Sequence, residues 1–208
     1  LFEGLAAGAR LKPEFQPFLV PAPVASEHSG YPLKRLLDIV VACVALCLLS
    51  PLMLLAAVAI AWTSPGPVIF RQTRLGKDGA PFTFYKFRSM RTDSDDSIHR
   101  HFVSALIQGR SEGSVVDETG VSYKLKADPR VTPIGKWLRK SSIDELPQLY
   151  NVLKGDMSLV GPRPALPYEA QQYQSWHLRR ILSVKPGITG LWQVEGRSRV
   201  TFNDMVRM

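Results

Sequence analysis

A long apolar stretch, residues 36–62, limits the possible folds of this chain more than any other part of the sequence. Asp38 is its only charged residue. About 20 apolar residues suffice for a helix that crosses a bilayer, so a spanning helix is the simplest interpretation. However, Ser50 and Pro51 lie near the middle, and a proline there removes a hydrogen bond and bends the helix. Each half alone would rise only about 16–21 Å, which is short of a hydrocarbon core of about 30 Å.

Two membrane arrangements are therefore compatible with the stretch. One is a kinked helix that spans the bilayer, and the other is a re-entrant helix that enters one leaflet and returns. In the re-entrant form, the side chain of Ser50 could bond a backbone group that Pro51 leaves free. Basic residues lie on both sides of the stretch, which weakens the case for a one-way crossing. These are Lys34, Arg35, Arg71, Arg74 and Lys77. The residues by themselves leave both arrangements open.

The charge balance and the cysteines narrow the classes of function. The 208-residue chain has room for one domain of ordinary size and carries a net charge of +8. Such a charge suits an anionic membrane surface, phosphorylated substrates or nucleic acid. No recognised nucleic-acid motif is present, so we expect no nucleic-acid partner. Cys43 and Cys47 are too few for a disulfide framework or a metal site of the usual spacing. Asp38, the charged residue in the apolar stretch, could cap the apolar helix or pair with Lys34 or Arg35.

A β-hairpin is predicted after the apolar stretch. Residues 68–72 and 82–88 read as strands on either side of a turn at residues 76–79. Lys86 and Arg88 would share one face of the second strand, either solvated or bound to a ligand. The polar residues 92–126 include acidic residues and histidines, but they lack a fixed ligand spacing. We therefore interpret them as a solvated insertion rather than a metal site.

Two adjacent carboxylates, Asp144 and Glu145, lie at the start of a predicted helix that ends near Lys154, with Gly155 as its C-terminal stop. In one interpretation Ser142 and Glu145 form a capping box. In the other, Asp144 is a nucleophile, because the positive end of a helix favours its ionised form. The two interpretations do not exclude each other.

Basic and apolar segments flank these carboxylates. Residues 134–140 predict an amphipathic helix containing Arg139, suited to a membrane interface or to phosphate binding. Arg163 lies between two prolines, which hold its backbone stiff, so it could clamp a phosphate or simply be exposed. Residues 167–182 are predicted as one helix, and residues 186–192 as a turn-rich connection.

Five motifs in order resemble the bacterial sugar transferases, the monotopic polyprenyl-phosphate phosphoglycosyl transferases. The motifs are KRLLD at 34–38, YKFRSM at 85–90, LRKSSIDELPQ at 138–148, VGPRP at 160–164 and KPGITG at 185–190. So many motifs in one order argue against chance agreement. The resemblance implies an α+β, mostly helical fold with interfacial amphipathic helices and a small β-hairpin. It also implies a re-entrant, helix-break-helix membrane anchor at residues 33–63, in which Ser50 and Pro51 form the break.

The resemblance further implies an activity at the cytoplasmic face of the bacterial inner membrane. Such enzymes transfer a sugar-1-phosphate from a UDP-sugar to polyprenyl phosphate, release UMP, and use Mg²⁺ and a covalent aspartyl-phosphosugar intermediate. By motif position, Asp144 would be the nucleophile and Glu145 would help to hold Mg²⁺. Phosphate or nucleotide contacts would fall to Lys86, Arg88, Arg139 and Arg163. The residues suit this chemistry, since phosphoryl transfer depends on neutralising phosphate charge and Mg²⁺ prefers one or two carboxylates plus phosphate oxygens.

The resemblance also divides the chain. Residues 1–30 would be a linker or the remnant of an N-terminal region, and residues 31–208 a catalytic domain that the family usually continues. The segment 190–198 is most similar to members that begin exopolysaccharide or O-antigen chains with glucose or galactose. A competing hypothesis is a non-catalytic scaffold that binds anionic lipid. The pair Asp144–Glu145 argues against it, because lipid binding does not need the pair. The sequence leaves the oligomeric state open, including a homo-oligomer.

Overall fold

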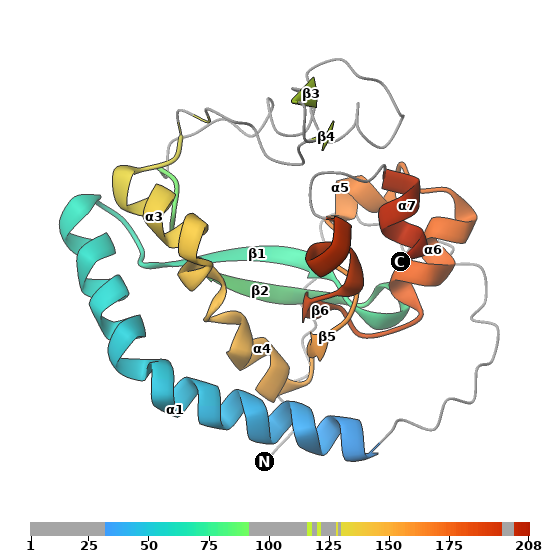
Figure 1. Cartoon of the computed structure of the whole chain (residues 1–208), viewed down its shortest axis with the longest axis horizontal. Coiled ribbons are helices and arrows are strands. Elements are labelled where there is room, and N and C mark those ends of the chain that lie inside the picture. Colours follow the sequence, from blue (N-terminus) through green and yellow to red (C-terminus); the bar gives the residue numbers. More distant parts are fainter. Residues whose placement is uncertain (1–31, 92–115, 118–119, 122–127, 129, 197–201) are drawn as a thin grey trace, which may run out of the picture.

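In the computed structural model, the described residues are 32–91, 116–117, 120–121, 128, 130–196 and 202–208. The predicted linker and most of the predicted insertion lie outside these residues. The described part is mostly helical, as expected, with two-stranded sheets between the helices. One long helix, α1 (Pro32–Thr63), runs beneath the hairpin and the shorter helices (Figure 1).

Helix α1 is continuous, so the predicted break is a bend rather than an interruption (Figure 1). Pro51 lies inside the helix and cannot donate to the carbonyl of Cys47, four residues earlier. The Ser50 hydroxyl donates to that carbonyl instead, across 2.9 Å. The compensating role predicted for Ser50 is thus confirmed, and it allows the helical path to continue through the proline.

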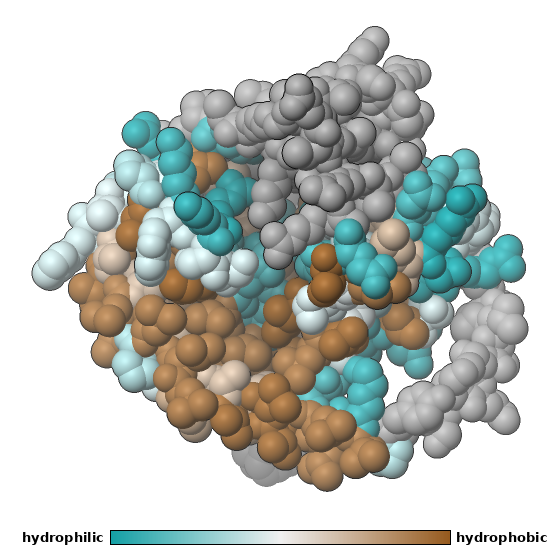
Figure 2. Space-filling model, viewed as in Figure 1, coloured by the Kyte–Doolittle hydropathy of each residue, from teal (hydrophilic) through white to brown (hydrophobic). Residues whose placement is uncertain are grey.

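Much of the apolar surface of α1 is exposed. Among the residues that the structure describes, α1 is the one helix whose length and composition would allow it to cross a membrane. Its exposed large apolar residues are Leu33, Leu36, Leu37, Val40, Val41, Val44, Leu48, Leu54, Leu55, Val58 and Trp62. They form a hydrophobic surface along the helix (Figure 2). A surface of this size indicates a partner other than water.

The predicted hairpin is present. Strand β1 (Ile69–Leu75) pairs antiparallel with β2 (Pro81–Phe87), with Ile69 opposite Phe87 and Leu75 opposite Pro81. The turn between them contains a short 3₁₀ helix, η1 (Lys77–Gly79). In this register Phe84 and Lys86 share a face with the residues opposite them on β1.

The helix that begins at the carboxylate pair differs from the prediction. Helix α3 (Pro133–Ser141) is followed by a 3₁₀ turn, η2 (Ile143–Glu145), and then by α4 (Gln148–Lys154). Ser142 has a left-handed backbone with φ of 59° and makes no side-chain cap bond, so the predicted capping box is wrong. Because Pro147 precedes the first residue of α4, its missing N–H breaks no helical bond. Gly155 ends α4 at φ of 94°, as predicted.

One side of α1 packs against β2, α3, η2 and α4. Ala42 packs in one buried cluster with Phe84, Leu149, Val152 and Met157. Farther along α1, Ala56 and Ile60 pack with Phe87, Leu138 and Ile143. Both stretches of α1 therefore contact the elements that bear the predicted site.

The C-terminal part forms a separate small core. Strand β5 (Ser158–Val160) pairs parallel with β6 (Gly187–Thr189), and a π-helix (Trp192–Gly196) and α7 (Phe202–Arg207) follow. The single helix predicted over 167–182 is wrong, since α5 (Pro167–Ala170) and α6 (Ser175–Leu182) are distinct. A ring nitrogen of His177 accepts a hydrogen bond from the backbone N–H of Gln174. This bond caps the N-terminus of α6 and separates it from α5.

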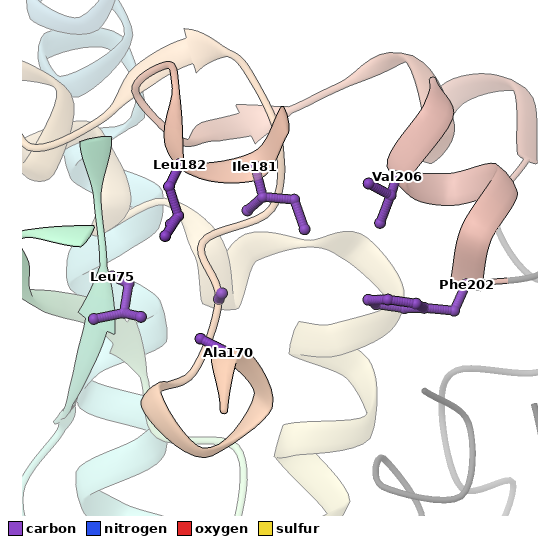
Figure 3. Packing of buried hydrophobic residues seen from close by; sticks show 7 residues of the cluster. Leu75, Ala170, Ile181, Leu182, Phe202 and Val206 are labelled. Atoms are coloured by element: carbon purple, nitrogen blue, oxygen red, sulfur yellow. The ribbon is translucent and has the colours of Figure 1, made fainter. Parts of the chain in front are cut away.

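Apolar residues from several elements close this C-terminal core. Figure 3 shows Leu75, at the end of β1, on one side of this core and residues of α7 on the other, with residues of α5 and α6 between them. The buried members are Leu75, Ala165, Ala170, Ile181, Leu182, Phe202 and Val206. The core thus packs the C-terminal helices against the end of the hairpin. Short strands β3 (Val116–Asp117) and β4 (Gly120–Val121) pair with each other outside this core.

Candidate active site

Three of the predicted site residues meet at one point. The Lys86 ammonium lies 2.8 Å from Glu145 Oε1 and 3.6 Å from Asp144 Oδ2. The Asp144 side chain is only 7% exposed, whereas those of Lys86 and Glu145 are 26% and 34% exposed. A buried carboxylate beside a partly exposed cation and a second carboxylate can hold a charged substrate at the edge of the protein. We call these three residues the carboxylate centre.

Asn151 aligns the two elements that meet in this centre. It is fully buried on α4, and its Oδ1 accepts from the Tyr85 backbone N–H at 3.2 Å. Its Nδ2 donates to the Thr83 carbonyl at 2.7 Å and to Asp156 at 3.2 Å. The amide therefore completes the outer edge of β2 next to Lys86. The motifs in the sequence do not point to Asn151, although a polar residue among the apolar positions of a buried helix could have indicated it.

The N-terminal end of α1 is hydrogen-bonded to β5 and to the end of α4. Asp38 pairs with Lys34 at 3.3 Å, which confirms one of the pairings predicted for it. It also accepts from the Ser158 hydroxyl at 2.8 Å and from the Leu159 N–H at 3.1 Å. Arg35 instead donates to the last carbonyls of α4, at 2.6 and 2.7 Å. A cation at these carbonyls satisfies groups that a helix leaves without partners.

Arg163 lies in a rigid loop, but its ion-pair partner is not a residue of the carboxylate centre. Close backbone contact between Gly161 and Gly187 fixes the start of the loop, since a Cβ on Gly187 would lie 2.1 Å from the Gly161 nitrogen. The Arg163 guanidinium pairs with Glu169 across 3.4 Å rather than with the carboxylate centre. Its side chain is still 38% exposed, which leaves part of it available to a ligand.

Arg88 is buried, contrary to the solvated alternative. Its Nη2 donates to the Ser64 carbonyl at 2.6 Å and to the Ser64 hydroxyl at 2.8 Å, which ties β2 to the C-terminal end of α1. Its Nε and Nη1 are buried and bond no residue of the described chain. The amide nitrogen of Gln148 is likewise buried and bonds no residue of the described chain. Buried N–H donors usually have an acceptor, so these atoms suit an anionic ligand or an ordered water.

Arg139 lies on α3 and is half-buried. Within the described residues it makes no ion pair, and its positive charge helps to lower the pKa of Asp128. The structure thus brings together Lys86, Asp144 and Glu145, whereas the three predicted arginines lie on separate elements and the contacts of Arg88 and Arg163 are with other residues.

The donor set of the centre fits the Mg²⁺ ion that the resemblance implies. The described residues contain no group of three potential protein ligands for a metal. Mg²⁺ commonly takes one or two carboxylates and fills its remaining positions with water and substrate phosphate. The oxygens of Asp144 and Glu145 already converge on one cation, the Lys86 ammonium. The pair is therefore suited to an ion that is shared with a phosphorylated substrate.

Comparison with known proteins agrees with the motifs. Residues 29–208 match the family described as bacterial sugar transferase. A galactosyl transferase, CpsE, of Streptococcus agalactiae is 48% identical over 84% of this chain and 36% of its own length. The undecaprenyl-phosphate galactose phosphotransferase of Salmonella typhimurium is 43% identical over 87% of this chain and 36% of its own. The UDP-glucose:undecaprenyl-phosphate glucose-1-phosphate transferase of Escherichia coli is 44% identical over 79% and 31%.

The chain spans about a third of the length of these three relatives. The family match, by contrast, covers the described hairpin, the carboxylate centre and α1. The chain belongs to the bacterial sugar transferase family.

Proposed function

We propose that this protein transfers a sugar-1-phosphate from a UDP-sugar to polyprenyl phosphate, with undecaprenyl phosphate as the acceptor and UMP as the product. The names of the relatives support the substrates, and they include both galactose and glucose donors. The transfer would be the first membrane step in the synthesis of an exopolysaccharide, capsule or O-antigen. The observation that carries the proposal is the meeting of Lys86, Asp144 and Glu145 at one point.

The proposed chemistry has two steps at one carboxylate. An Asp144 oxygen attacks the phosphorus that bears the sugar, and the bond from that phosphorus to the bridging oxygen breaks, so its electron pair leaves with UMP. A phosphate oxygen of the polyprenyl phosphate then attacks the same phosphorus and releases Asp144. A covalent intermediate divides one transfer between two bulky substrates into two displacements.

The neighbouring residues would supply charge and position. Lys86 lies beside both carboxylates and would move onto the phosphate oxygens as the donor binds, which lowers the repulsion between Asp144 and its target. Arg163, Arg139 and the buried Arg88 would hold other phosphate oxygens. Glu145 would hold Mg²⁺, which neutralises phosphate charge when it is bound.

We further propose that α1 is a re-entrant anchor on the cytoplasmic leaflet of the bacterial inner membrane. Its N-terminal end is bonded to the body through Arg35, and its C-terminal end through Ser64 and Arg88. The hairpin and α4 lie along one side of the bent helix (Figure 1). A helix that crossed the bilayer would pull polar elements bonded to one of its ends into the hydrocarbon, at high cost.

The test is UMP release by the protein in nanodiscs, with Mg²⁺, undecaprenyl phosphate and a panel of UDP-sugars. We expect release with one sugar and its loss in Asp144→Asn. The control is Asp78→Asn, because Asp78 is exposed in the hairpin turn and has φ of 57°, a conformation that asparagine tolerates. Without acceptor, a donor labelled at the sugar-bearing phosphate should label the wild-type protein and leave Asp144→Asn unlabelled.

The opposite result would favour another class of protein. If vesicles bind the chain in a salt-sensitive manner and no UDP-sugar yields UMP, a non-catalytic membrane scaffold becomes the better explanation.

A further inference from the structure

A second charged cluster lies at the other end of the hairpin face. Glu169 on α5 is fully buried, and both of its carboxylate oxygens have partners. Oε1 pairs with Arg163 Nη1 at 3.4 Å, and Oε2 accepts from the Leu166 N–H at 2.9 Å and from the Tyr173 hydroxyl at 3.5 Å. The same carboxylate therefore caps α5 and holds the arginine of the rigid loop.

Arg74 is the second cation of this cluster. It is buried on β1, and it donates to neutral acceptors, Gln72 Oε1 at 3.0 Å and the Pro164 carbonyl at 2.9 Å. Burial, together with the positive charge of Arg163, lowers the pKa of Arg74 to about 10, so the side chain is still protonated at neutral pH. We call Arg74, Arg163 and Glu169 the arginine cluster.

The arginine cluster holds two positive charges and one negative charge. An excess positive charge in a largely buried group is costly unless an anion compensates it. The excess lies partly at the surface, because Arg163 is the member that keeps 38% of its side chain exposed. The cluster is thus arranged to attract an anion from solution to Arg163.

One aromatic ring joins the arginine cluster to the carboxylate centre. The guanidinium carbon of Arg74 lies 5.2 Å from the centre of the Phe84 ring, and the ammonium of Lys86 lies 5.8 Å from the same point. Phe84 and Lys86 are two residues apart on β2 and share its face. An anion at Arg163 would therefore be a near neighbour of a phosphoryl group at Asp144, as two parts of one nucleotide sugar would be.

We propose that Glu169 is a positioning residue for the donor, which holds Arg163 where the guanidinium binds a phosphate oxygen of the UDP-sugar. This inference rests on the proposed function and adds Glu169 to the residues that shape the donor site. Glu169 does not itself touch the substrate. It restricts the conformations of the Arg163 side chain. The conformational entropy of that side chain is therefore lost when the protein folds rather than when the substrate binds.

The decisive variant is Glu169→Gln. Its amide oxygen can still accept from the Leu166 N–H, so the start of α5 is preserved while the charge that holds Arg163 is lost. We expect the KM for the UDP-sugar to rise about tenfold, since a hydrogen bond to a charged group is worth about that factor or more. kcat at saturating donor should change less than about twofold, because Asp144 and Lys86 are untouched.

Two further variants separate positioning from folding. Tyr173→Phe removes a hydroxyl from the same carboxylate but leaves its charge, so its KM should match the wild type. Arg163→Gln should raise KM at least as much as Glu169→Gln, and the double variant should be no worse than Arg163→Gln alone, because residues that act as a unit are not additive. Thermal unfolding of each variant reports any loss of fold.

UDP binding by calorimetry gives a readout without turnover. We expect Glu169→Gln to weaken UDP by about the same tenfold factor. An unchanged or improved affinity, or a full additional loss in the double variant, would overturn the inference. A wild-type protein that binds UDP but releases no UMP with any donor would refute the proposed function, while the calorimetric comparison would still decide the role of Glu169.

Discussion

The Lys86 ammonium donates to the Glu145 carboxylate across 2.8 Å and thereby joins strand β2 to the turn that carries Asp144. The two residues are 59 positions apart in the chain. Their contact places one positive charge beside two negative ones, so a phosphoryl group would bind there only with further positive charge, such as a Mg²⁺ ion held by the carboxylates. A phosphate that enters would replace carboxylate oxygens as the partners of Lys86.

Replacement of Lys86 tests this relationship. We expect Lys86→Gln to lower the rate of UMP release about 100-fold, because it removes a preorganised cation from the reacting phosphate. Initial rates at saturating UDP-sugar measure the effect. Lys136→Gln, an exposed residue on α3, is the matched control and should keep the wild-type rate. Equal rates in the two variants would mean that Lys86 has no part in the transfer.

Asn151 should matter for stability as well as for the site. In Asn151→Leu the backbone groups of Thr83 and Tyr85 lose their partners, which should lower the free energy of unfolding by about 1–3 kcal/mol for each group left unsatisfied. Asn151→Asp keeps an acceptor for Tyr85, but it cannot donate to Thr83 and it buries a carboxylate beside Asp156, so a loss at least as large is expected. Thermal unfolding in detergent measures both. The exposed Gln171, at the end of α5, provides the control, and a Gln171→Leu variant as unstable as Asn151→Leu would refute the explanation.

The path of α1 can be tested by cysteine labelling. The variants are Leu33→Cys and Thr63→Cys, each made in a background with Cys43→Ser and Cys47→Ser. If the helix is re-entrant, an impermeant thiol reagent outside intact spheroplasts should label neither position, and both should react once the membrane is opened. Labelling of one end from outside would instead establish a spanning helix.

Asp128 should make stability depend on pH. Arg130 Nε and Nη2 donate to its two oxygens at 2.8 Å each, and these bonds hold the pKa of the buried carboxyl below its usual range. The folded pKa is thus lower than the unfolded value of about 3.9, so the ionised carboxylate contributes its full stability above about pH 4. That contribution is lost as the pH falls through the folded pKa.

The corresponding measurement is the melting temperature of the wild type and of Asp128→Asn across this range. The wild type should be more stable at neutral pH, and the difference should shrink as the pH falls below about 4. A difference that stays constant with pH would show that the charge of Asp128 does not contribute to stability.

Helices and strands were predictable where the pattern of neighbouring residues alone decides the local structure. The apolar run, the alternating strands and the glycine after Lys154 correspond to α1, the hairpin and the end of α4. The capping box failed because Ser142 serves as the C-cap of α3, which forces its backbone into a left-handed conformation. The single helix over 167–182 failed because the side chains of Glu169 and His177 each cap a separate start.

The sequence by itself determined the family, the presence of one long apolar helix and the residue types of the carboxylate centre, because these depend on motifs and on the composition of neighbouring residues. Only the tertiary structure decided which charges meet. Lys86 lies against Glu145, Asp38 against Ser158 across 120 positions of the chain, and Arg163 against Glu169. A charged side chain has several possible partners of opposite sign, and the packing of apolar residues brings only some of them within a few ångströms.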